Sequence, residues 1–422
     1  MSCYSGPEIS SSGLVLSLDP ANIKSYNQSE NLLKYSEQFE NVVWIRTNTS
    51  VSTNIAVDPN EYLTADKLIC NNGVTGRKSI CQPYTSFIAG TTYTFSIYLK
   101  QAGFTNAMIW IDTVDSSPNA YMGAVSLINL AAGTVAGSQT TIVNASNGWY
   151  RCYITFTATV SGTYNLQISL GEANGSGTAA GDGVSGIYLW GAQLEIGASL
   201  TAYTSTIGSI ITRSTAVSDI SNNTNTGTLV NSPVYSPAGY FSYDYTKSQQ
   251  LTFANNPNLQ FLGNSPYTLE AWIYPTRNPG ASNYTGIFDR ESNPGSGRDG
   301  YNLYFLGGTA GATTQITAER FSAGTASATW ITLYESVSVN AWHHIVATYD
   351  GSLLRIYRNG LFVAASGAAT GAITNTVKTL TIGVRGGNRF DGRIGVTNIY
   401  NRALSASEIK QNFNAYRSKY GI

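Results

Sequence analysis

The sequence predicts an all-β protein made of antiparallel β-sandwiches and closed by one short C-terminal helix. Along most of the chain, hydrophobic residues alternate with polar ones, and many of the hydrophobic residues are β-branched or aromatic. Gly, Ser, Asn and Asp interrupt these runs about every ten residues, which is typical of short strands joined by turns. A sustained helical pattern stands only near the C-terminus, where Ser405 and Glu408 form a capping box.

Length and charge limit the classes of function. A chain of 422 residues suffices for more than one domain. Lys+Arg and Asp+Glu number 24 each, and charged residues make up only 11%, so we expect no surface for nucleic acid. The N-terminal MSCYSGPEIS has neither the basic segment nor the apolar core of a signal peptide, and no apolar run is long enough to span a membrane. We therefore expect synthesis in the cytoplasm and no membrane insertion.

The strand candidates fall into two groups along the chain. The first group comprises residues 93–100, 107–113, 149–160, 164–170 and 186–196, and the second comprises residues 269–274, 301–306, 316–321, 378–384 and 393–400. Between members of the second group, residues 342–366 predict a three-stranded meander, because Asp350-Gly351 and Asn359-Gly360 are typical two-residue hairpin turns.

The C-terminal helix should dock on a sheet. Leu404 and Ile409 can form a hydrophobic staple across its first turn, and Ile409, Phe413 and Tyr416 share one face.

Two segments near the N-terminus each look like the start of a domain. The alternating run of residues 14–18 stops at Asp19-Pro20, and a second hydrophobic run begins at Asn31. One of these two openings must therefore belong to a domain further along the chain.

The segments YTLEAWIYP, NAWHHIVATYDGSLLRIYRNG, LTIGV and FDGRIGVTNIYNRALSASEI lie in the C-terminal half. Together, residues 267–402 resemble the concanavalin A-like lectin/glucanase fold in its laminin-G and pentraxin-related form. In such domains the opening strand continues directly into a D-x-S-x-N…G-T-L-x-N-x-P-x-Y segment. Here the opening is residues 13–26, whereas that second part stands at residues 219–235.

The intervening segments NLLKYSEQFENVVW, TADKLIC, AGTTYTFSIYLK, NGWYRCYITFTATVSGTY and GDGVSGIYLWGAQLEIG resemble another module. It is the galactose-binding-like jelly roll of bacteriophage structural and tail proteins, which is related to carbohydrate-binding modules. We therefore predict two jelly-roll sandwiches, one inserted in the other. Residues 1–29 hold the first strand of the concanavalin A-like domain, residues 30–205 form the insert, and residues 206–422 complete the first domain. Insertion at a surface loop is well tolerated.

Residues suited to catalysis are not evident. Glucanases of the concanavalin A-like fold use an E-x-D-x-x-E strand that supplies a nucleophile and an acid, and this spacing is absent. Glu270 stands alone in its strand, and the adjacent His343 and His344 should point to opposite faces of theirs. We therefore expect no enzymatic activity.

The resemblance to laminin-G and pentraxin-like domains leaves Ca²⁺ open as a cofactor, because such domains often bind it through loop carboxylates. The candidate ligands are Asp289, Glu291, Asp299 and Asp391, and the alternative is that they are ordinary solvated loop carboxylates.

The sequence also contains residues that are candidates for contacting a glycan. Trp110 and Trp330 are the tryptophans that the family pattern accounts for least, so their rings are candidates for stacking on a sugar. The loop of residues 289–301 carries mixed charge and three glycines and adds Arg290, Arg298 and Asp299 as candidate ligand-binding residues.

The cysteines Cys3, Cys70, Cys81 and Cys152 follow no metal-ligand spacing. Cys70 and Cys81 end and begin two runs around a glycine-containing loop, so they could be antiparallel neighbours close enough for a disulfide. In a protein assembled in the cytoplasm we expect them to be reduced.

The two resemblances together imply a non-enzymatic structural protein of a bacteriophage virion, such as a surface appendage, a fibre-associated protein or a decoration subunit, that binds a glycan on the host surface. Its expected partners are further copies of itself and other virion proteins of the capsid, neck or tail. One alternative is a bacterial surface or secreted lectin-like module, which a secretion signal would favour. A polysaccharide-degrading enzyme is the other, which release of reducing sugar would favour.

Overall fold

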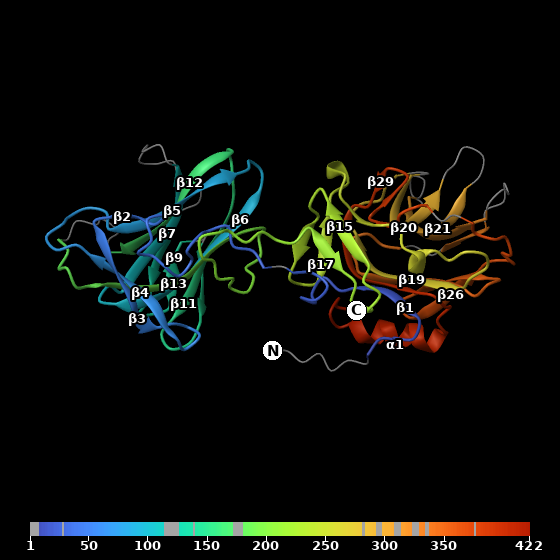
Figure 1. Ribbon diagram of the computed structural model, residues 1–422, viewed down its shortest axis with the longest axis horizontal. Coiled ribbons are helices and arrows are strands. Elements are labelled where there is room, and N and C mark those ends of the chain that lie inside the picture. Colours follow the sequence, from blue (N-terminus) through green and yellow to red (C-terminus); the bar gives the residue numbers. More distant parts are fainter. Residues whose placement is uncertain are drawn as a thin grey trace. The chain divides into compact units, whose positions relative to one another are not determined.

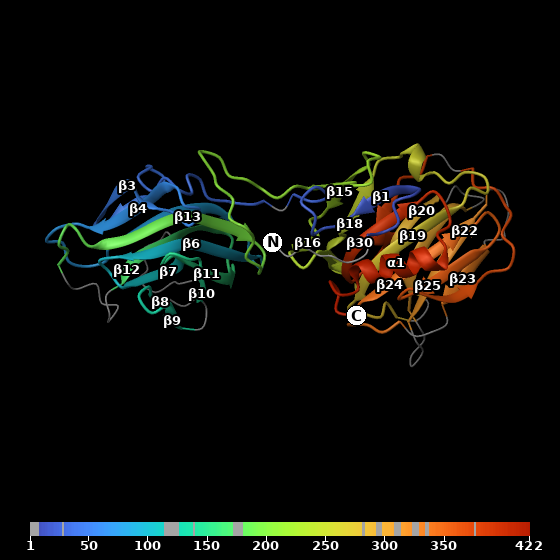
Figure 2. The ribbon, with the colours of Figure 1, turned by 90° about the horizontal axis from the view of Figure 1, so that it is seen from below.

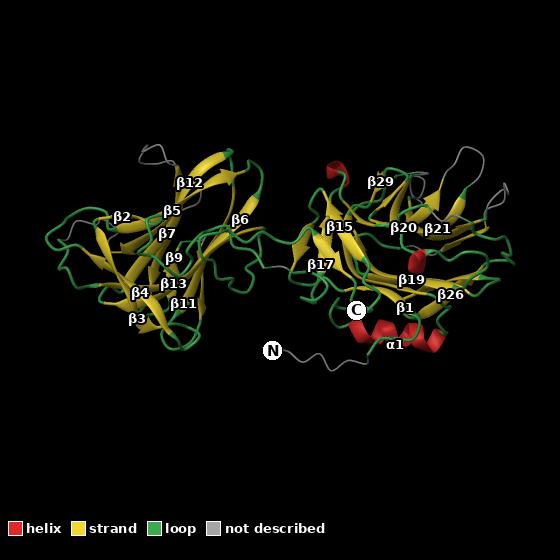
Figure 3. Ribbon diagram, viewed as in Figure 1, coloured by secondary structure: helices red, strands yellow, loops and turns green. Residues whose placement is uncertain are grey.

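The computed structural model describes residues 8–27, 29–113, 126–137, 140–171, 180–280, 283–292, 298–307, 314–322, 329–333, 337–374 and 377–422. Its elements are almost entirely antiparallel strands, as the sequence predicts (Figures 1 and 3). The chain divides into two compact units. Residues 28–213 form the inserted unit, and residues 1–27 together with residues 214–422 form the split unit.

The inserted unit is a sandwich of two six-stranded sheets, with the orders β10-β11-β6-β13-β4-β3 and β2-β5-β12-β7-β8-β9. Its core lies between them, where Phe95, Ile97 and Leu99 of β6 pack in one cluster with Ile109 and Ile111 of β7. The strands are β2 (Ile45–Thr47), β3 (Thr49–Val57), β4 (Leu63–Cys70), β5 (Ser79–Phe87), β6 (Thr92–Ala102), β7 (Asn106–Thr113), β8 (Ser126–Asn129), β9 (Thr134–Ala136), β10 (Thr140–Asn144), β11 (Tyr150–Thr157), β12 (Gly162–Gly171) and β13 (Gly186–Ile196).

The split unit contains two eight-stranded sheets. The helix-side sheet has the order β16-β17-β30-β19-β24-β25-β26, with β1 also pairing with β30, and the cavity-side sheet has the order β14-β15-β18-β27-β20-β21-β22-β23. The helix-side strands are β1 (Leu14–Leu18), β16 (Val234–Ser236), β17 (Tyr240–Tyr243), β19 (Tyr267–Pro275), β24 (His343–Tyr349), β25 (Leu354–Arg358), β26 (Leu361–Ala365) and β30 (Gly392–Tyr400). The cavity-side strands are β14 (Ala216–Ser218), β15 (Thr226–Val230), β18 (Gln250–Phe253), β20 (Tyr284–Ser292), β21 (Asp299–Leu306), β22 (Gln315–Phe321), β23 (Thr329–Leu333) and β27 (Thr381–Ile382).

The first strand belongs to the split unit, which confirms the strand predicted from the divided opening motif. β1 pairs antiparallel with β30, and Leu16 lies opposite Ile399. Leu16 is fully buried, and it packs in a core cluster with residues beyond position 214. The chain leaves and re-enters this unit at adjacent points, since the Ser214 N–H donates to the Asn27 carbonyl over 3.4 Å. A long insertion between two such points costs little loop-closure entropy.

The predicted meander is present as β24, β25 and β26, but only one of its turns is as expected. Arg358 pairs with Leu361 across the two-residue turn Asn359-Gly360, and both turn residues have positive φ angles of 51° and 77°. Tyr349 pairs with Leu354, so the first loop has four residues rather than two. The Asp350 side chain stabilises this longer loop by accepting from the backbone of residues 352 and 353.

Helix α1 (Ala406–Tyr416) covers the helix-side sheet, as predicted from its amphipathic pattern. Ser405 and Glu408 form the expected capping box, and Leu404 packs in one cluster with Ile409. In Figure 2 the helix crosses the sheet near β19, β24 and β30, where Phe413 packs against a cluster that includes Trp272. The helix thereby covers the part of this sheet's outer face around Trp272 and His344.

The cysteine expectation is partly wrong. Cys70 lies in β4 and Cys81 in β5, which belong to different sheets, so they are not antiparallel neighbours. Both are buried free thiols, as is Cys152. Among the described residues, no helix combines the length and the apolar character that a membrane span requires.

Candidate functional site

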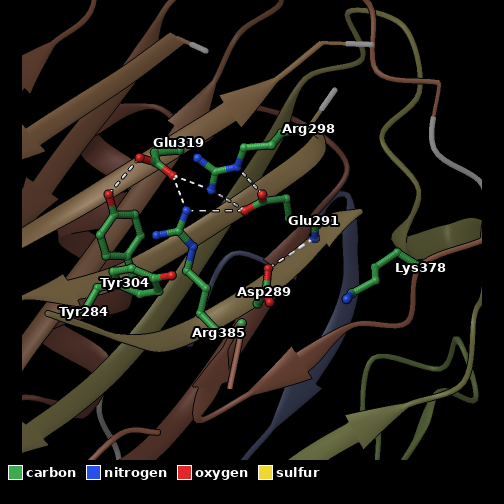
Figure 4. Close-up of a pocket in the computed structure, with 9 residues that line it drawn as sticks. Tyr284, Asp289, Glu291, Arg298, Tyr304, Glu319, Lys378 and Arg385 are labelled. Carbon is green, nitrogen blue, oxygen red and sulfur yellow. Dashed lines mark hydrogen bonds and ion pairs between the residues drawn. The ribbon is translucent and has the colours of Figure 1, made fainter. Parts of the chain in front are cut away.

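A cavity of about 450 Å³ lies on the face of the cavity-side sheet that is turned away from the core. Alternation along β21 creates this face, because Tyr301, Leu303 and Phe305 pack into the core while Tyr304 lines the cavity. We call it the charged cavity. Its lining residues are Tyr284, Asp289, Glu291, Arg298, Tyr304, Glu319, Lys378, Arg385 and Gly386 (Figure 4).

Two carboxylates and two guanidinium groups form a network in this cavity. Glu291 and Glu319 each contact both Arg298 and Arg385. Arg298 donates from Nε and Nη2 to the two oxygens of Glu291, with 2.6 Å from Nη2 to Oε2, and Arg385 Nη2 donates to Glu319 Oε2 over 2.6 Å. Asn302 also donates to Glu291 over 2.9 Å. Because each charge has two partners, the network holds its side chains in fixed positions.

Two tyrosine rings form another wall of the cavity, as Figure 4 shows. The guanidinium carbon of Arg385 lies 4.5 Å from the ring centre of Tyr284 and 4.1 Å from that of Tyr304, so the cation contacts both rings. Tyr304 donates its hydroxyl to Glu319 over 2.7 Å. Burial, reinforced by the charge of Glu319, raises the pKa of Tyr304, so the hydroxyl remains a donor.

The carboxyl group of Asp289 in this cavity has a raised pKa. Burial and, to a smaller extent, the charge of the neighbouring Glu291 raise its pKa to about 6, and Lys378 and Arg385 oppose this shift. One of its oxygens accepts from the Glu291 N–H over 3.2 Å. Asp289 therefore changes its protonation state within a mildly acidic pH range.

The candidate ligand-binding residues from the sequence lie in different places. Arg298 lines the charged cavity, with its side chain 41% exposed. Arg290 is buried and donates to Asn255. Asp299 is also buried and accepts from the backbone and the hydroxyl of Thr374. The loop of residues 289–301 thus contributes its ends to the site, and residues 293–297 of that loop lie outside the described residues.

Neither of the two tryptophan candidates is among the described residues that line this cavity. Trp110 is only 3% exposed in β7, and the Arg77 guanidinium lies 5.1 Å from its ring centre. Its ring therefore has no open face for stacking on a sugar, which corrects that expectation. The backbone of Trp330 pairs with Glu319 in the register of β23 and β22, and its side chain lies outside the described part of the structure.

The four carboxylates suggested for Ca²⁺ do not converge. Asp289 and Glu291 line the charged cavity, whereas Asp299 binds Thr374 and Asp391 forms an ion pair with Arg277 over 3.1 Å. Within the described ranges, no three His, Cys, Asp or Glu side chains are grouped so that they could hold a metal ion. The expected set is therefore not assembled, because strong protein partners already engage Glu291, Asp299 and Asp391.

Glu270 and the two histidines lie away from this site. Glu270 and His344 are fully buried under α1, with 2.7 Å between Glu270 Oε1 and His344 Nε2. Asn398 and Asn412 also donate to Glu270, over 3.1 and 2.9 Å. His343 Nε2 lies 2.9 Å from the Ser338 carbonyl oxygen. Asn412 thus ties α1 to its sheet through Glu270, and Glu270 and His344 have no access to a solute.

Sequence reasoning missed six of the cavity residues, namely Tyr284, Tyr304, Glu319, Lys378, Arg385 and Gly386. A partial signal existed, because alternation places Tyr304 on the face opposite Leu303 and Phe305. Nothing in the sequence says that β22, β21, β20 and β27 lie side by side, and the site depends on that strand order.

Comparison with protein families agrees with this fold for part of the chain. Residues 245–410 match the family model of the concanavalin A-like lectin/glucanases superfamily, so this part of the chain has a lectin-like fold. Similar solved structures include the binding domain of Paraclostridial Mosquitocidal Protein 1, with 19% identity, a TM-score of 0.38 and coverage of 47% of this chain and 49% of that chain. Another is the botulinum neurotoxin serotype D binding domain, with 15% identity, a TM-score of 0.37 and coverage of 47% and 48%. The chain thus spans about half the length of these two chains. No curated protein matches it.

Proposed function

We propose that this protein is a non-enzymatic glycan-binding protein and that the charged cavity binds the saccharide. The observation that carries this proposal is the cavity itself, since a space of about 450 Å³ combines two tyrosine rings with several fixed polar groups. Saccharides present both hydroxyl groups and apolar ring faces. A lectin-like fold with such a cavity supplies partners for both.

Each kind of side chain in the cavity has a distinct use. Asp289 offers carboxylate oxygens as acceptors for sugar hydroxyls, and Arg298 offers N–H donors on its partly exposed side. The rings of Tyr284 and Tyr304 supply apolar contact area at a small cost in conformational entropy. Glu291, Glu319 and Arg385 mainly position the others, because they bond to one another.

Binding without cleavage follows from how the carboxylates are engaged. A glycosidase needs one carboxyl group as acid and a second one placed across the scissile bond as base or nucleophile. Asp289 has a raised pKa that would suit an acid, but Glu291 and Glu319 are each held by two guanidinium groups. No carboxylate described in the cavity is left to act as the second group.

The test is binding of the full chain to a glycan array, with the protein displayed at high density. Asp289→Asn and Arg298→Gln should each reduce binding at least about tenfold, since each removes a charge-assisted hydrogen bond. Arg355→Gln is the matched control, because Arg355 also forms an ion pair with a carboxylate, Asp350, but does not line the cavity.

Three results would contradict the proposal. They are an absence of binding to any glycan, unchanged binding by both cavity variants, or release of reducing ends from a bound polysaccharide. Thermal unfolding of each variant shows whether a loss of binding is a loss of fold.

We propose further that the protein is exposed on a bacteriophage virion, assembled in the host cytoplasm as a homo-oligomer bound to other virion proteins. The support is the resemblance of residues 30–205 and 267–402 to modules that occur in phage structural proteins. A polar cavity of this kind binds one sugar weakly, and repetition on a particle raises avidity by roughly 10²- to 10⁴-fold. The isolated monomer should therefore bind glycan weakly.

Particle localisation tests this second proposal. Antibodies against the chain should label purified virions from the source culture, and mass spectrometry should detect it there in many copies. Recovery from the bacterial envelope or culture medium in the absence of particles would instead favour the surface or secreted lectin.

A further inference from the structure

A second cavity, of about 300 Å³, adjoins the charged cavity. Tyr284 lines both cavities, and the neighbouring glycines Gly386 and Gly387 line one each. We call it the arginine cavity, because two arginines and no acidic residue stand among its lining residues, which are Tyr245, Arg277, Pro279, Asn283, Tyr284, Thr285, Gly387, Asn388 and Arg389.

A single hairpin supplies one arginine to each cavity. β28 (Val384–Arg385) pairs with β29 (Asn388–Arg389) across the turn Gly386-Gly387, where φ is 53° and 88°. Glycine adopts such angles at both positions without strain, so the turn fixes the tight return of the chain. Arg385 thereby reaches the charged cavity, and Arg389 reaches the arginine cavity.

The two arginines of the second cavity differ in their partners. Arg277 donates from Nε to Asp391 over 3.1 Å, and its guanidinium carbon lies 3.9 Å from the ring centre of Tyr245. Arg389 differs, because its Nε is buried and has no hydrogen-bond partner. Among the residues that the structure describes, Arg389 also makes no ion pair. Arg385 on the same hairpin also has a buried Nε without a partner, but its Nη2 contacts two carboxylates, so the difference lies in the ion pairs.

A buried donor without a partner costs free energy unless something else satisfies it. An anion would do so here, because a guanidinium group binds a carboxylate or sulfate through two parallel hydrogen bonds. Arg277 could add a second positive charge from the same wall. Continuity with the charged cavity through Tyr284 indicates that the anion is a substituent of the same saccharide.

We propose that the arginine cavity binds the anionic group of an acidic saccharide, with Arg389 as its main contact, while a neighbouring sugar unit occupies the charged cavity. This inference rests on the proposed glycan binding and deepens it, since it names the class of glycan. A carboxylate and a sulfate share the chemistry that the site recognises.

The experiment compares matched saccharides on the array used above. One pair is an oligogalacturonate and its methyl ester, and the other is dextran sulfate and dextran, so each pair differs in charge on a common backbone. The full chain should bind the charged member of one pair at least about tenfold more tightly at low ionic strength. The pair that shows this difference identifies the anion.

Arg389→Gln should bring that ratio down to about one, because it removes the charge that discriminates between the two members of the pair. Arg417→Gln is the matched control, since Arg417 is an exposed arginine of α1's C-terminus outside both cavities. It should leave the ratio unchanged. Raising the salt concentration should reduce the ratio for the wild type and leave it near one for Arg389→Gln.

Equal binding within both pairs overturns this inference while leaving the proposed glycan binding intact. An unchanged ratio in Arg389→Gln, or an equal fall in Arg417→Gln, does so as well. If the wild type binds no glycan anywhere on the array, the proposed function fails and the inference fails with it.

Discussion

Leu16→Ala should destabilise the split unit and leave the inserted unit unchanged, although the substitution lies close to the inserted unit in sequence. Leu16 is fully buried in β1 and packs in the core cluster of the split unit. Truncating a fully buried leucine costs about 2–5 kcal/mol, because it removes buried methyl groups and leaves a cavity. β1 pairs with β30, and the fixed strand gives the cavity little freedom to collapse.

Differential scanning calorimetry can measure this effect. For a domain of about 200 residues, each kcal/mol lowers the melting temperature by about 2–4 °C, so a loss of about 3 kcal/mol predicts a shift of about 6–12 °C in one transition. Leu189→Ala is the matched control, since Leu189 of β13 is fully buried in the core of the inserted unit. It should shift the other transition.

The reasoning would be refuted if Leu16→Ala and Leu189→Ala lowered the same transition. It would also be refuted if Leu16→Ala left both transitions in place, because β1 would then contribute nothing to the core in which it lies.

Three further predictions concern single side chains. The pKa of Asp289 is about 6 in the folded protein, above its ordinary value of 3.8, so its contribution to stability is present below about pH 4 and is lost as the pH rises to about 6. Chemical unfolding across this range should show a decline on the order of 3 kcal/mol that Asp289→Asn removes. Arg213→Gln should destabilise the inserted unit by about 3–5 kcal/mol in calorimetry, because it leaves the buried carboxylates Glu30 and Glu195 without their shared cation, and a stabilising effect would contradict this. Ser405→Ala should cost about 1 kcal/mol by removing the cap of α1, seen as faster amide exchange in the first turn, whereas Ser405→Asp should largely retain protection.

The parts of the fold that were predicted correctly depend on residues close together in the sequence. The capping box needs only Ser405 and Glu408, and the turn after β25 needs only Asn359 and Gly360. The N-terminal strand is an exception, because its partner β30 lies far away in the sequence. It was assigned to the correct unit because the second part of its motif stands at residues 219–235.

The errors arise where an outcome depends on distant parts of the chain. Alternation assigned Trp110 to a strand but could not show that Arg77 lies against its ring. Proximity in sequence suggested a pairing of Cys70 with Cys81, and the fold placed them in different sheets.

The amino-acid sequence by itself determined that this protein is built from antiparallel strands, roughly where several of them lie, and that a C-terminal helix docks on a sheet. These properties follow from side-chain periodicity and local capping, which act over a few residues. Only the tertiary structure decided the candidate site. Glu319 and Arg385 are 66 positions apart, and they meet because β27, β20, β21 and β22 pair in that order. Strand pairing is made by backbone hydrogen bonds that every residue except proline can form, so the side chains of one strand do not specify its neighbour.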